Sequence, residues 1–171
     1  GLSGQELLNW LSNHPEAEVK VATSTKFQGQ RIHQAFPFLP KQGLTFSSHE
    51  EDLSGCDVVF LAVPNQASLE KTPKLIEKSL RVIDLSGVFR IRDISLFEKS
   101  YGIKHSSPEM LKESVFGLPE YFRSSIKNAR LIANPGCYPT GALLGILPFG
   151  DLLQDLDRAP IIDAKSGVSG A

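Results

Sequence analysis

The chain has 171 residues, and its 18 Lys and Arg against 19 Asp and Glu give a formal net charge of −1. Nucleic-acid-binding and membrane-surface proteins usually carry a basic excess or a basic face, so this balance argues against both classes. Hydrophobic residues make up 41% of the sequence, which has neither a membrane-spanning apolar run nor a basic leader, so a globular, cytoplasmic protein is predicted.

The first part of the chain is predicted to form one helix, one strand and a loop. Leucines recur at helical spacing behind a glycine-containing start, which predicts a helix over residues 1–13. Residues 18–23 alternate apolar and polar side chains and are predicted to be a strand. The Pro- and Gly-containing residues 25–43 are predicted to be a loop.

Two apolar runs in the middle of the chain predict strands that are buried on both faces. Residues 56–64 are apolar apart from Asp57 and end at a proline, and residues 81–85 have an apolar centre between Arg81 and Asp84. Such runs are typical of the strands of a parallel sheet. A helix over residues 68–79 is predicted to connect them.

The rest of the chain contains an irregular stretch and two further predicted strands. Residues 92–123 show no clear periodicity and are predicted to be an excursion that packs near the sheet. Strands are predicted at 129–133 and 160–164, with a helix at 140–147. Strands that alternate with helices predict a doubly wound, Rossmann-like α/β fold with a parallel sheet, whose ligands bind at the carboxyl ends of the strands.

The two ends of the sequence predict an internal piece of a longer enzyme. A dinucleotide-binding unit needs a strand ahead of its glycine turn, and Gly1 already stands in that turn. The glycine-rich residues 165–171 are an unusual terminus, because nothing beyond them anchors the preceding strand. We therefore expect residues 1–157 to form a nucleotide-binding domain without its first strand, and residues 158–171 to begin a second α/β domain.

Two features near the start of the chain bear on a cofactor. Gly1 and Gly4 at the head of a helix match half of a dinucleotide-binding glycine turn, although glycines that merely start a helix look the same. NAD-preferring enzymes usually have an Asp or Glu after the second strand, whereas residues 23–26 offer three hydroxyls and a lysine. These residues suit the 2′-phosphate of NADP, and an exposed lysine in a polar loop is the equally weighted alternative.

Cys137 is the strongest candidate for a reactive residue. It lies between a predicted strand and the N-terminus of a predicted helix, where partial positive charge favours the nucleophilic thiolate. The alternative is a small buried side chain, which is the common fate of a free cysteine and the preferred interpretation of Cys56. Two cysteines are too few for a disulfide framework.

The remaining polar candidates are one arginine and three histidines. Arg90 follows a turn of small residues after the strand predicted at 81–85, and its guanidinium suits a phosphate or carboxylate, with a surface ion pair as the alternative. His33, His49 and His105 show no ligand-like spacing with each other or with either cysteine. Each is predicted to be a loop histidine, and no metal site is predicted.

Residues 133–141, Ala-Asn-Pro-Gly-Cys-Tyr-Pro-Thr-Gly, resemble the active-site signature of the N-acetyl-γ-glutamyl-phosphate reductases, which are relatives of the aspartate-semialdehyde dehydrogenases. Further stretches agree with that family in order, at residues 1–8, 84–90, 105–120 and 163–171. The resemblance covers essentially the whole chain, and the cysteine motif is its most specific part.

The resemblance implies roles for individual residues. It implies that Cys137 is the nucleophile and that Arg90 and Asn134 bind the acyl-phosphate substrate. The cofactor-binding residues that it implies are Gly1, Ser3, Gly4, Ser24, Lys26, Pro64, Ser166 and Gly167, with Ser169 and Gly170 in the same loop near the nicotinamide. Gly87 and Gly141 stand where relatives often have alanine, which we expect to change little.

The same resemblance implies the NADPH-dependent reduction of N-acetyl-γ-glutamyl phosphate to its semialdehyde through a cysteine thioester, a step of arginine biosynthesis. It also implies a homo-oligomer of two or four copies and a catalytic histidine outside this chain. Two alternatives stay open. One is a sister enzyme that acts on aspartyl phosphate or on a carrier-linked aminoadipyl or glutamyl phosphate, and the other is a non-catalytic nucleotide-binding module.

Overall fold

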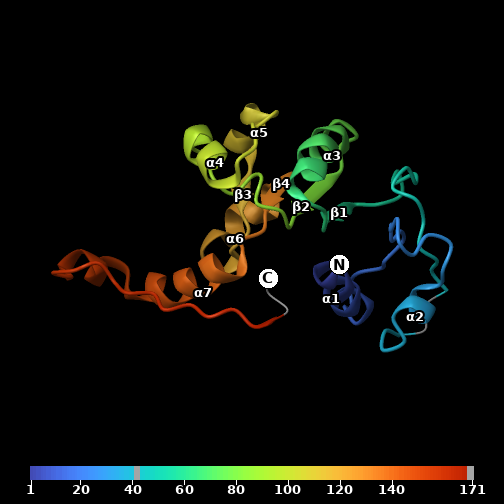
Figure 1. Ribbon diagram of the computed structural model, residues 1–171, viewed down its shortest axis with the longest axis horizontal. Coiled ribbons are helices and arrows are strands. Elements are labelled where there is room, and N and C mark those ends of the chain that lie inside the picture. Colours follow the sequence, from blue (N-terminus) through green and yellow to red (C-terminus); the bar gives the residue numbers. More distant parts are fainter. Residues whose placement is uncertain (41–42, 169–171) are drawn as a thin grey trace. The chain divides into compact units, whose positions relative to one another are not determined.

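The computed structural model describes residues 1–40 and 43–168 (Figure 1). The chain divides into two compact units, Gly1–Asp57 and Val58–Ala171. The first unit holds two helices and an aromatic core, and the second holds the sheet and all the remaining helices of the described chain. No helix among the described residues combines the length and the apolar character that crossing a membrane requires.

The first unit contains α1 (Leu2–Ser12) and the single turn α2 (Ile32–Ala35). The helix predicted over residues 1–13 is confirmed, whereas α2 lies inside a segment predicted to be a loop. An aromatic core holds the unit together, because the rings of Phe27 and Phe36 meet edge to face with centroids 5.2 Å apart. The buried members of this core are Ala22, Ile32, Leu39 and Phe46.

The strand predicted over residues 18–23 is wrong except at its last residue. Thr23 forms an isolated parallel bridge with Ser47, and the residues before Thr23 have no regular structure. Two backbone hydrogen bonds flank the bridge, since Ser47 N–H donates to the Ala22 carbonyl at 2.9 Å and Ser24 N–H donates to the Ser47 carbonyl at 3.1 Å. A strand needs a paired neighbour along its length, and the described residues provide one at this position alone.

The second unit is built on a four-stranded, fully parallel sheet with the order β1-β2-β4-β3 (Figure 1). The strands are β1 (Val58–Leu61), β2 (Arg81–Asp84), β3 (Val115–Phe116) and β4 (Leu131–Ala133). Three of them lie within predicted strands and are shorter, while β3 falls in the segment predicted to be irregular. The prediction of a parallel, doubly wound α/β fold is confirmed.

Helix α3 (Asn65–Glu77) connects β1 to β2 and buries one face. It begins three residues before the predicted start and contains Pro73, which removes one backbone donor but does not end the helix. Its buried residues are Ser68, Leu69, Thr72 and Leu75, which recur at the three- and four-residue spacing of a helix face.

The segment predicted to be irregular contains two helices, α4 (Ile94–Tyr101) and α5 (Pro108–Glu113), and the first half of a third, α6 (Pro119–Asn128). The prediction was wrong because helices of six to ten residues are too short to show a clear period. Local signals do mark them. The Asp93 carboxylate accepts a hydrogen bond from Leu96 N–H at 2.9 Å at the start of α4, and α5 and α6 each begin with proline.

The chain continues through α7 (Cys137–Ile146) and a 3₁₀ segment, η1 (Leu147–Asp155). Helix α7 begins three residues before its predicted start, at the cysteine itself. The strand predicted at residues 160–164 is wrong. That segment has no partner strand among the described residues, and Ile161 and Ile162 are 96% and 55% exposed.

Candidate active site

The carboxyl ends of β1, β2 and β4 lie side by side because these parallel strands are neighbours in the sheet. Backbone hydrogen bonds continue past the strand ends. Leu85 N–H donates to the Leu61 carbonyl at 3.0 Å, and Asn134 N–H donates to the Asp84 carbonyl at 2.8 Å. The turns that follow the three strands are therefore joined into one edge.

Cys137 is exposed at this edge as the first residue of α7, directly after the turn that follows β4. Gly136 precedes the helix, and no side chain caps its N-terminus. The predicted placement of Cys137 between a strand and a helix N-terminus is confirmed. Cys56 lies just before β1 and is half-buried, which is less than the small buried side chain that was predicted.

Arg90 connects the turn after β2 with the turn that carries the cysteine. Its Nε–H donates to the Asn134 carbonyl at 2.7 Å, and its Nη2 donates to the Leu85 carbonyl at 2.7 Å. A Cβ on Gly136 would lie 3.1 Å from Arg90 Nη1, so glycine there permits the close approach of the guanidinium. Neither ion pair found among the described residues involves Arg90, which leaves the predicted surface ion pair without support.

Asn134 begins the cysteine turn and is half-buried. Its side-chain amide donates to the Pro135 carbonyl at 3.1 Å, and its backbone accepts the bond from Arg90. Gly117, at the end of β3, lies against it, since a Cβ on Gly117 would be 3.2 Å from Asn134 Cα. The backbone of Asn134 therefore lies in contact with both Arg90 and Gly117.

The turn after β2 is shaped by a buried carboxylate. Asp84 accepts hydrogen bonds from Ser86 Oγ at 2.6 Å and from Ser86 N–H at 3.1 Å. Ser86 Oγ in turn accepts from Val88 N–H at 3.3 Å. Because Asp84 is fully buried, these bonds replace its lost water contacts and fix the backbone of the turn.

Asn65 and Tyr101 also contact this turn, and no sequence pattern singles out either residue. Gly87 N–H donates to Asn65 Oδ1 at 3.0 Å, which ties the start of α3 to the turn. The Tyr101 ring occupies the space that a Cβ on Gly87 would need, whereas a Cβ on Gly141 meets nothing. Alanine at position 87 would therefore require the Tyr101 ring to move. The expectation that glycine instead of alanine changes little at this position is wrong.

His105 lies in a loop, as predicted, but it is only 7% exposed. Its Nε2 is 3.2 Å from the Val88 carbonyl oxygen, and Ser107 N–H donates to its Nδ1 at 3.2 Å. Burial lowers the pKa of His105 below the ordinary value of 6.5, although the Val88 hydrogen bond and the nearby Glu98 carboxylate act in the opposite direction. The sequence gives no spacing signal for this environment.

The predicted cofactor-binding residues are divided between the two units. Gly1, Ser3 and Gly4 lie at the start of α1, which has no side-chain cap and no acidic residue in its first turn. Ser24 Oγ accepts from Phe27 N–H at 3.2 Å, and the Lys26 ammonium lies over the Phe27 ring at 5.2 Å from its centroid. Both side chains thus belong to one turn, next to the Thr23 bridge.

The other predicted cofactor-binding residues belong to the second unit. Pro64 precedes α3 at the carboxyl end of β1 and is exposed. Ser166 and Gly167 lie in an exposed segment without regular structure. Ser169 and Gly170 fall outside the described residues.

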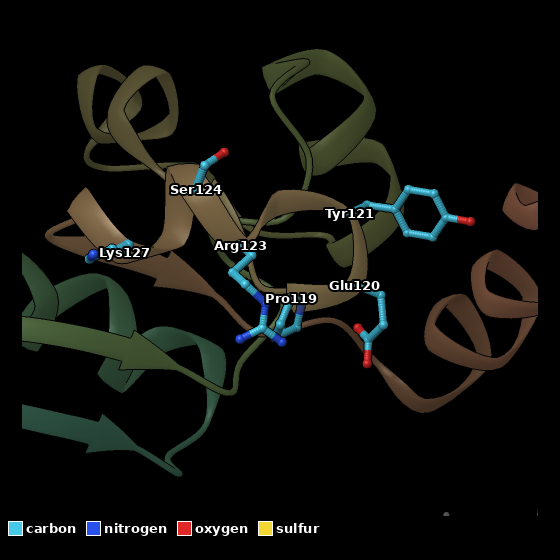
Figure 2. Close-up of a pocket in the computed structure, with 6 residues that line it drawn as sticks. All are labelled: Pro119, Glu120, Tyr121, Arg123, Ser124 and Lys127. Atoms are coloured by element: carbon cyan, nitrogen blue, oxygen red, sulfur yellow. The ribbon is translucent and has the colours of Figure 1, made fainter.

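Two open pockets lie on the second unit. The pocket of about 600 Å³ over α6 is lined by Pro119, Glu120, Tyr121, Arg123, Ser124 and Lys127. Figure 2 shows that its polar side chains point in different directions rather than toward a common centre. The pocket of about 450 Å³ has Arg90, Arg92 and Ser114 among its lining residues. We therefore place the candidate site at the Arg90 and Cys137 edge and not over α6.

Sequence comparisons identify similar proteins along the whole chain. Residues 1–129 match the family model described as "Semialdehyde dehydrogenase, NAD binding domain". The chain is 49% identical to an N-acetyl-gamma-glutamyl-phosphate reductase of Nitrosospira multiformis and 47% identical to one of Laribacter hongkongensis, in each case over 100% of this chain and 51% of the relative. The chain thus spans about half the length of the curated relatives that it matches.

Solved structures share the fold at lower sequence identity. An aspartate semialdehyde dehydrogenase II from Vibrio cholerae, complexed with ASA, matches 88% of this chain and 42% of its own with a TM-score of 0.58 and 21% identity. An aspartate semialdehyde dehydrogenase with NADP from Candida albicans matches 90% of this chain and 44% of its own with a TM-score of 0.59 and 17% identity. These matches support the parallel α/β architecture.

Proposed function

Because the chain belongs to the semialdehyde dehydrogenase family through its NAD-binding domain, we propose that it is the nucleotide-binding, nucleophile-bearing part of an N-acetyl-γ-glutamyl-phosphate reductase. The observation that carries the proposal is the exposure of Cys137 at the start of α7, on a turn that Arg90 holds through Asn134. The identities of 47% and 49% to reductases of that name favour this acyl phosphate over aspartyl phosphate.

In the proposed reaction, the Cys137 thiolate attacks the carbonyl carbon of the acyl phosphate. A carbon–sulfur bond forms, the carbon–oxygen bond to phosphate breaks, and phosphate leaves with its electron pair. Arg90 uses two of its five N–H donors on backbone carbonyls, so three remain to hold the phosphate group. Asn134 is proposed to orient the substrate from the same turn.

The residues of the chain fit a nicotinamide dinucleotide phosphate. The uncapped start of α1 at Gly1, Ser3 and Gly4 suits a pyrophosphate, because its N–H groups have no side-chain partner. The Ser24 hydroxyl and the Lys26 ammonium suit a 2′-phosphate. Bound NADPH would supply the hydride that reduces the Cys137 thioester to the aldehyde. The proposed set is completed by Pro64, Ser166 and Gly167.

The proposal can be tested in protein expressed from the complete reading frame that contains this chain. N-acetyl-γ-glutamyl phosphate should be reduced in preference to aspartyl phosphate. Cys137→Ser should abolish turnover because the oxygen nucleophile is far weaker, whereas Cys56→Ser should retain it. Preference for aspartyl phosphate would favour the sister enzyme. Full activity in Cys137→Ser would remove the cysteine from the reaction, and slow alkylation of Cys137 at neutral pH would favour a non-catalytic module.

The preference for NADPH over NADH is part of the same proposal. We expect tighter binding of NADPH than of NADH, and we expect Lys26→Ala to weaken NADPH selectively. Equal use of NADH by the unaltered protein would contradict this preference.

The balanced charge and the two free cysteines support a cytoplasmic location, and the family resemblance supports a homo-oligomer in which residues from 158 onward begin a second domain.

A further inference from the structure

Two buried side chains that have no part in the proposed reaction hydrogen-bond to the backbone of the turn that carries Arg90. Ser114 Oγ donates to the Phe89 carbonyl at 3.1 Å, and His105 Nε2 lies 3.2 Å from the Val88 carbonyl oxygen. These carbonyls belong to the last two peptide groups before Arg90. The backbone direction at Arg90 is therefore fixed by contacts on its buried side.

The hydrogen bonds of His105 select one protonation state. A carbonyl oxygen can only accept, so Nε2 must carry a hydrogen to bond the Val88 carbonyl. Ser107 N–H can only donate, so Nδ1 must be unprotonated to accept it at 3.2 Å. Only the neutral ring with hydrogen on Nε2 satisfies both partners.

The surroundings of the ring maintain this state. The rings of Phe89 and Phe97 approach it edge to face, with centroid distances of 5.4 and 5.0 Å. The charged group that acts on the ring is Glu98, whose carboxylate accepts from His105 N–H at 3.3 Å, and the sequence neighbour Lys104 is exposed. Burial lowers the pKa of His105 and outweighs the opposing effects of the Val88 hydrogen bond and the Glu98 charge. The ring is therefore neutral at neutral pH.

Arg90 transmits this constraint to the cysteine turn. Its Nε–H donates to the Asn134 carbonyl at 2.7 Å, three residues before Cys137. A rotation of the Val88 or Phe89 peptide group would move the base of the Arg90 side chain and so lengthen that bond. Loss of the His105 donor would also leave the buried Val88 carbonyl without its partner, and a rotation of the peptide group toward another donor would relieve that cost.

We propose that His105, as the neutral Nε2–H tautomer, is a positioning residue that orients Arg90 through the Val88 carbonyl, both for the phosphate group and for the Cys137 turn. The reaction to which this applies rests on the proposed function, whereas the tautomer and its hydrogen bonds do not. His105 touches no reacting atom, so its effect is indirect.

Two substitutions in the complete protein distinguish the effect of the His105 Nε2–H donor from the effect of its ring packing. His105→Phe keeps an aromatic ring but has no donor, whereas His105→Gln can place an amide N–H near the Nε2 position. We expect His105→Phe to raise both the KM for the acyl phosphate and the inhibition constant of inorganic phosphate about ten-fold, with His105→Gln restoring most of the loss. The KM for NADPH should stay constant in both. His14→Gln, on an exposed residue, is the control and should change none of these values.

Unchanged phosphate inhibition in His105→Phe, or an equal rise in the KM for NADPH, would overturn the positioning role. A second measurement covers variants that fail to fold and does not need turnover. Long-range ¹H–¹⁵N spectra of the unaltered protein at neutral pH should show His105 protonated at Nε2 alone. A spectrum with hydrogen at Nδ1 would overturn the proposal. A spectrum with hydrogen at Nε2 alone, in a protein that shows no reductase activity, would support the tautomer and refute the proposed function.

Discussion

The contacts of Arg90 give this residue a structural role in addition to the anion binding that the sequence predicts. From the sequence it is an anion-binding side chain after a strand, but two of its donors hold the Leu85 and Asn134 carbonyls. The planar guanidinium can bridge two acceptors and still present donors on its far side. Substrate binding and support of the cysteine turn are therefore compatible in one residue.

We predict that Arg90→Lys impairs the proposed reaction even though the positive charge is kept. An ammonium group cannot reproduce the planar bridge between two carbonyls, so kcat/KM for the acyl phosphate should fall by the equivalent of about 1.5–3 kcal/mol. Steady-state kinetics measure the loss. Arg123→Lys, on the exposed surface of α6, is the matched control and should have no effect. Unchanged constants in Arg90→Lys would exclude Arg90 from the site.

Gly87 provides a second test at the same turn. Gly87→Ala should destabilise the protein by about 1–3 kcal/mol, because its methyl group overlaps the Tyr101 ring and forces that side chain to move. In a double-mutant cycle, Tyr101→Ala should remove most of this penalty. Urea unfolding measures each free energy. An undiminished penalty in the double variant would show that the strain lies in the backbone and not against Tyr101.

Among the secondary-structure elements, α4 is the helix with the clearest start and stop signals. Its first turn is capped by Asp93, and it ends at Gly102, which has φ +67°. This left-handed conformation is disfavoured for residues with a Cβ. The helix also carries Phe97, which is fully buried and lies against His105.

We expect Gly102→Ala to lower the free energy of unfolding by about 1 kcal/mol, since the space around Gly102 is open and only the backbone conformation opposes a methyl group. Gly141→Ala is the matched control. Gly141 lies inside α7 with nothing near its Cβ position, so alanine there should be neutral or stabilise the helix by up to about 1 kcal/mol. Equal effects from the two substitutions would contradict the conformational argument.

The elements also show what the sequence could predict. Strands β1 and β4 are wholly apolar and β2 has an apolar centre, so these strands and their parallel arrangement could be predicted, as could the placement of Cys137. The segment around Thr23 has strand periodicity, but pairing depends on distant residues that a local pattern does not contain. The same limit applies to His105, Ser114 and the Asn134 carbonyl, whose contacts span 17 to 44 residues.

For the molecule as a whole, the lowered pKa of His105 predicts an acid-dependent loss of stability. An unfolded chain binds this proton near the ordinary pKa of 6.5, whereas the folded protein binds it only at lower pH. The stabilisation is thus complete above pH 6.5 and is lost as the pH falls toward the folded value, with a slope of at most about 1.4 kcal/mol per pH unit.

Urea unfolding of the complete protein across this range tests the prediction, and His105→Gln should have a shallower acid dependence than the unaltered protein. His14→Gln, which removes an exposed histidine, should keep the full dependence. Parallel curves for the unaltered protein and His105→Gln would show that other groups cause the acid sensitivity.

The order of the strands has a consequence for how the protein is made. β4 is the last of the four to leave the ribosome, yet it lies between β2 and β3, and β3 pairs with no other strand of the described chain. A nascent chain shorter than residue 131 therefore exposes two unpaired strand edges, which are typical targets for chaperones and for aggregation. Cys137 follows β4 by four residues, so the step that inserts β4 between β2 and β3 also positions the thiol. In a newly synthesised chain, Cys137 should therefore reach its position at the start of α7 only when β4 pairs with β2 and β3.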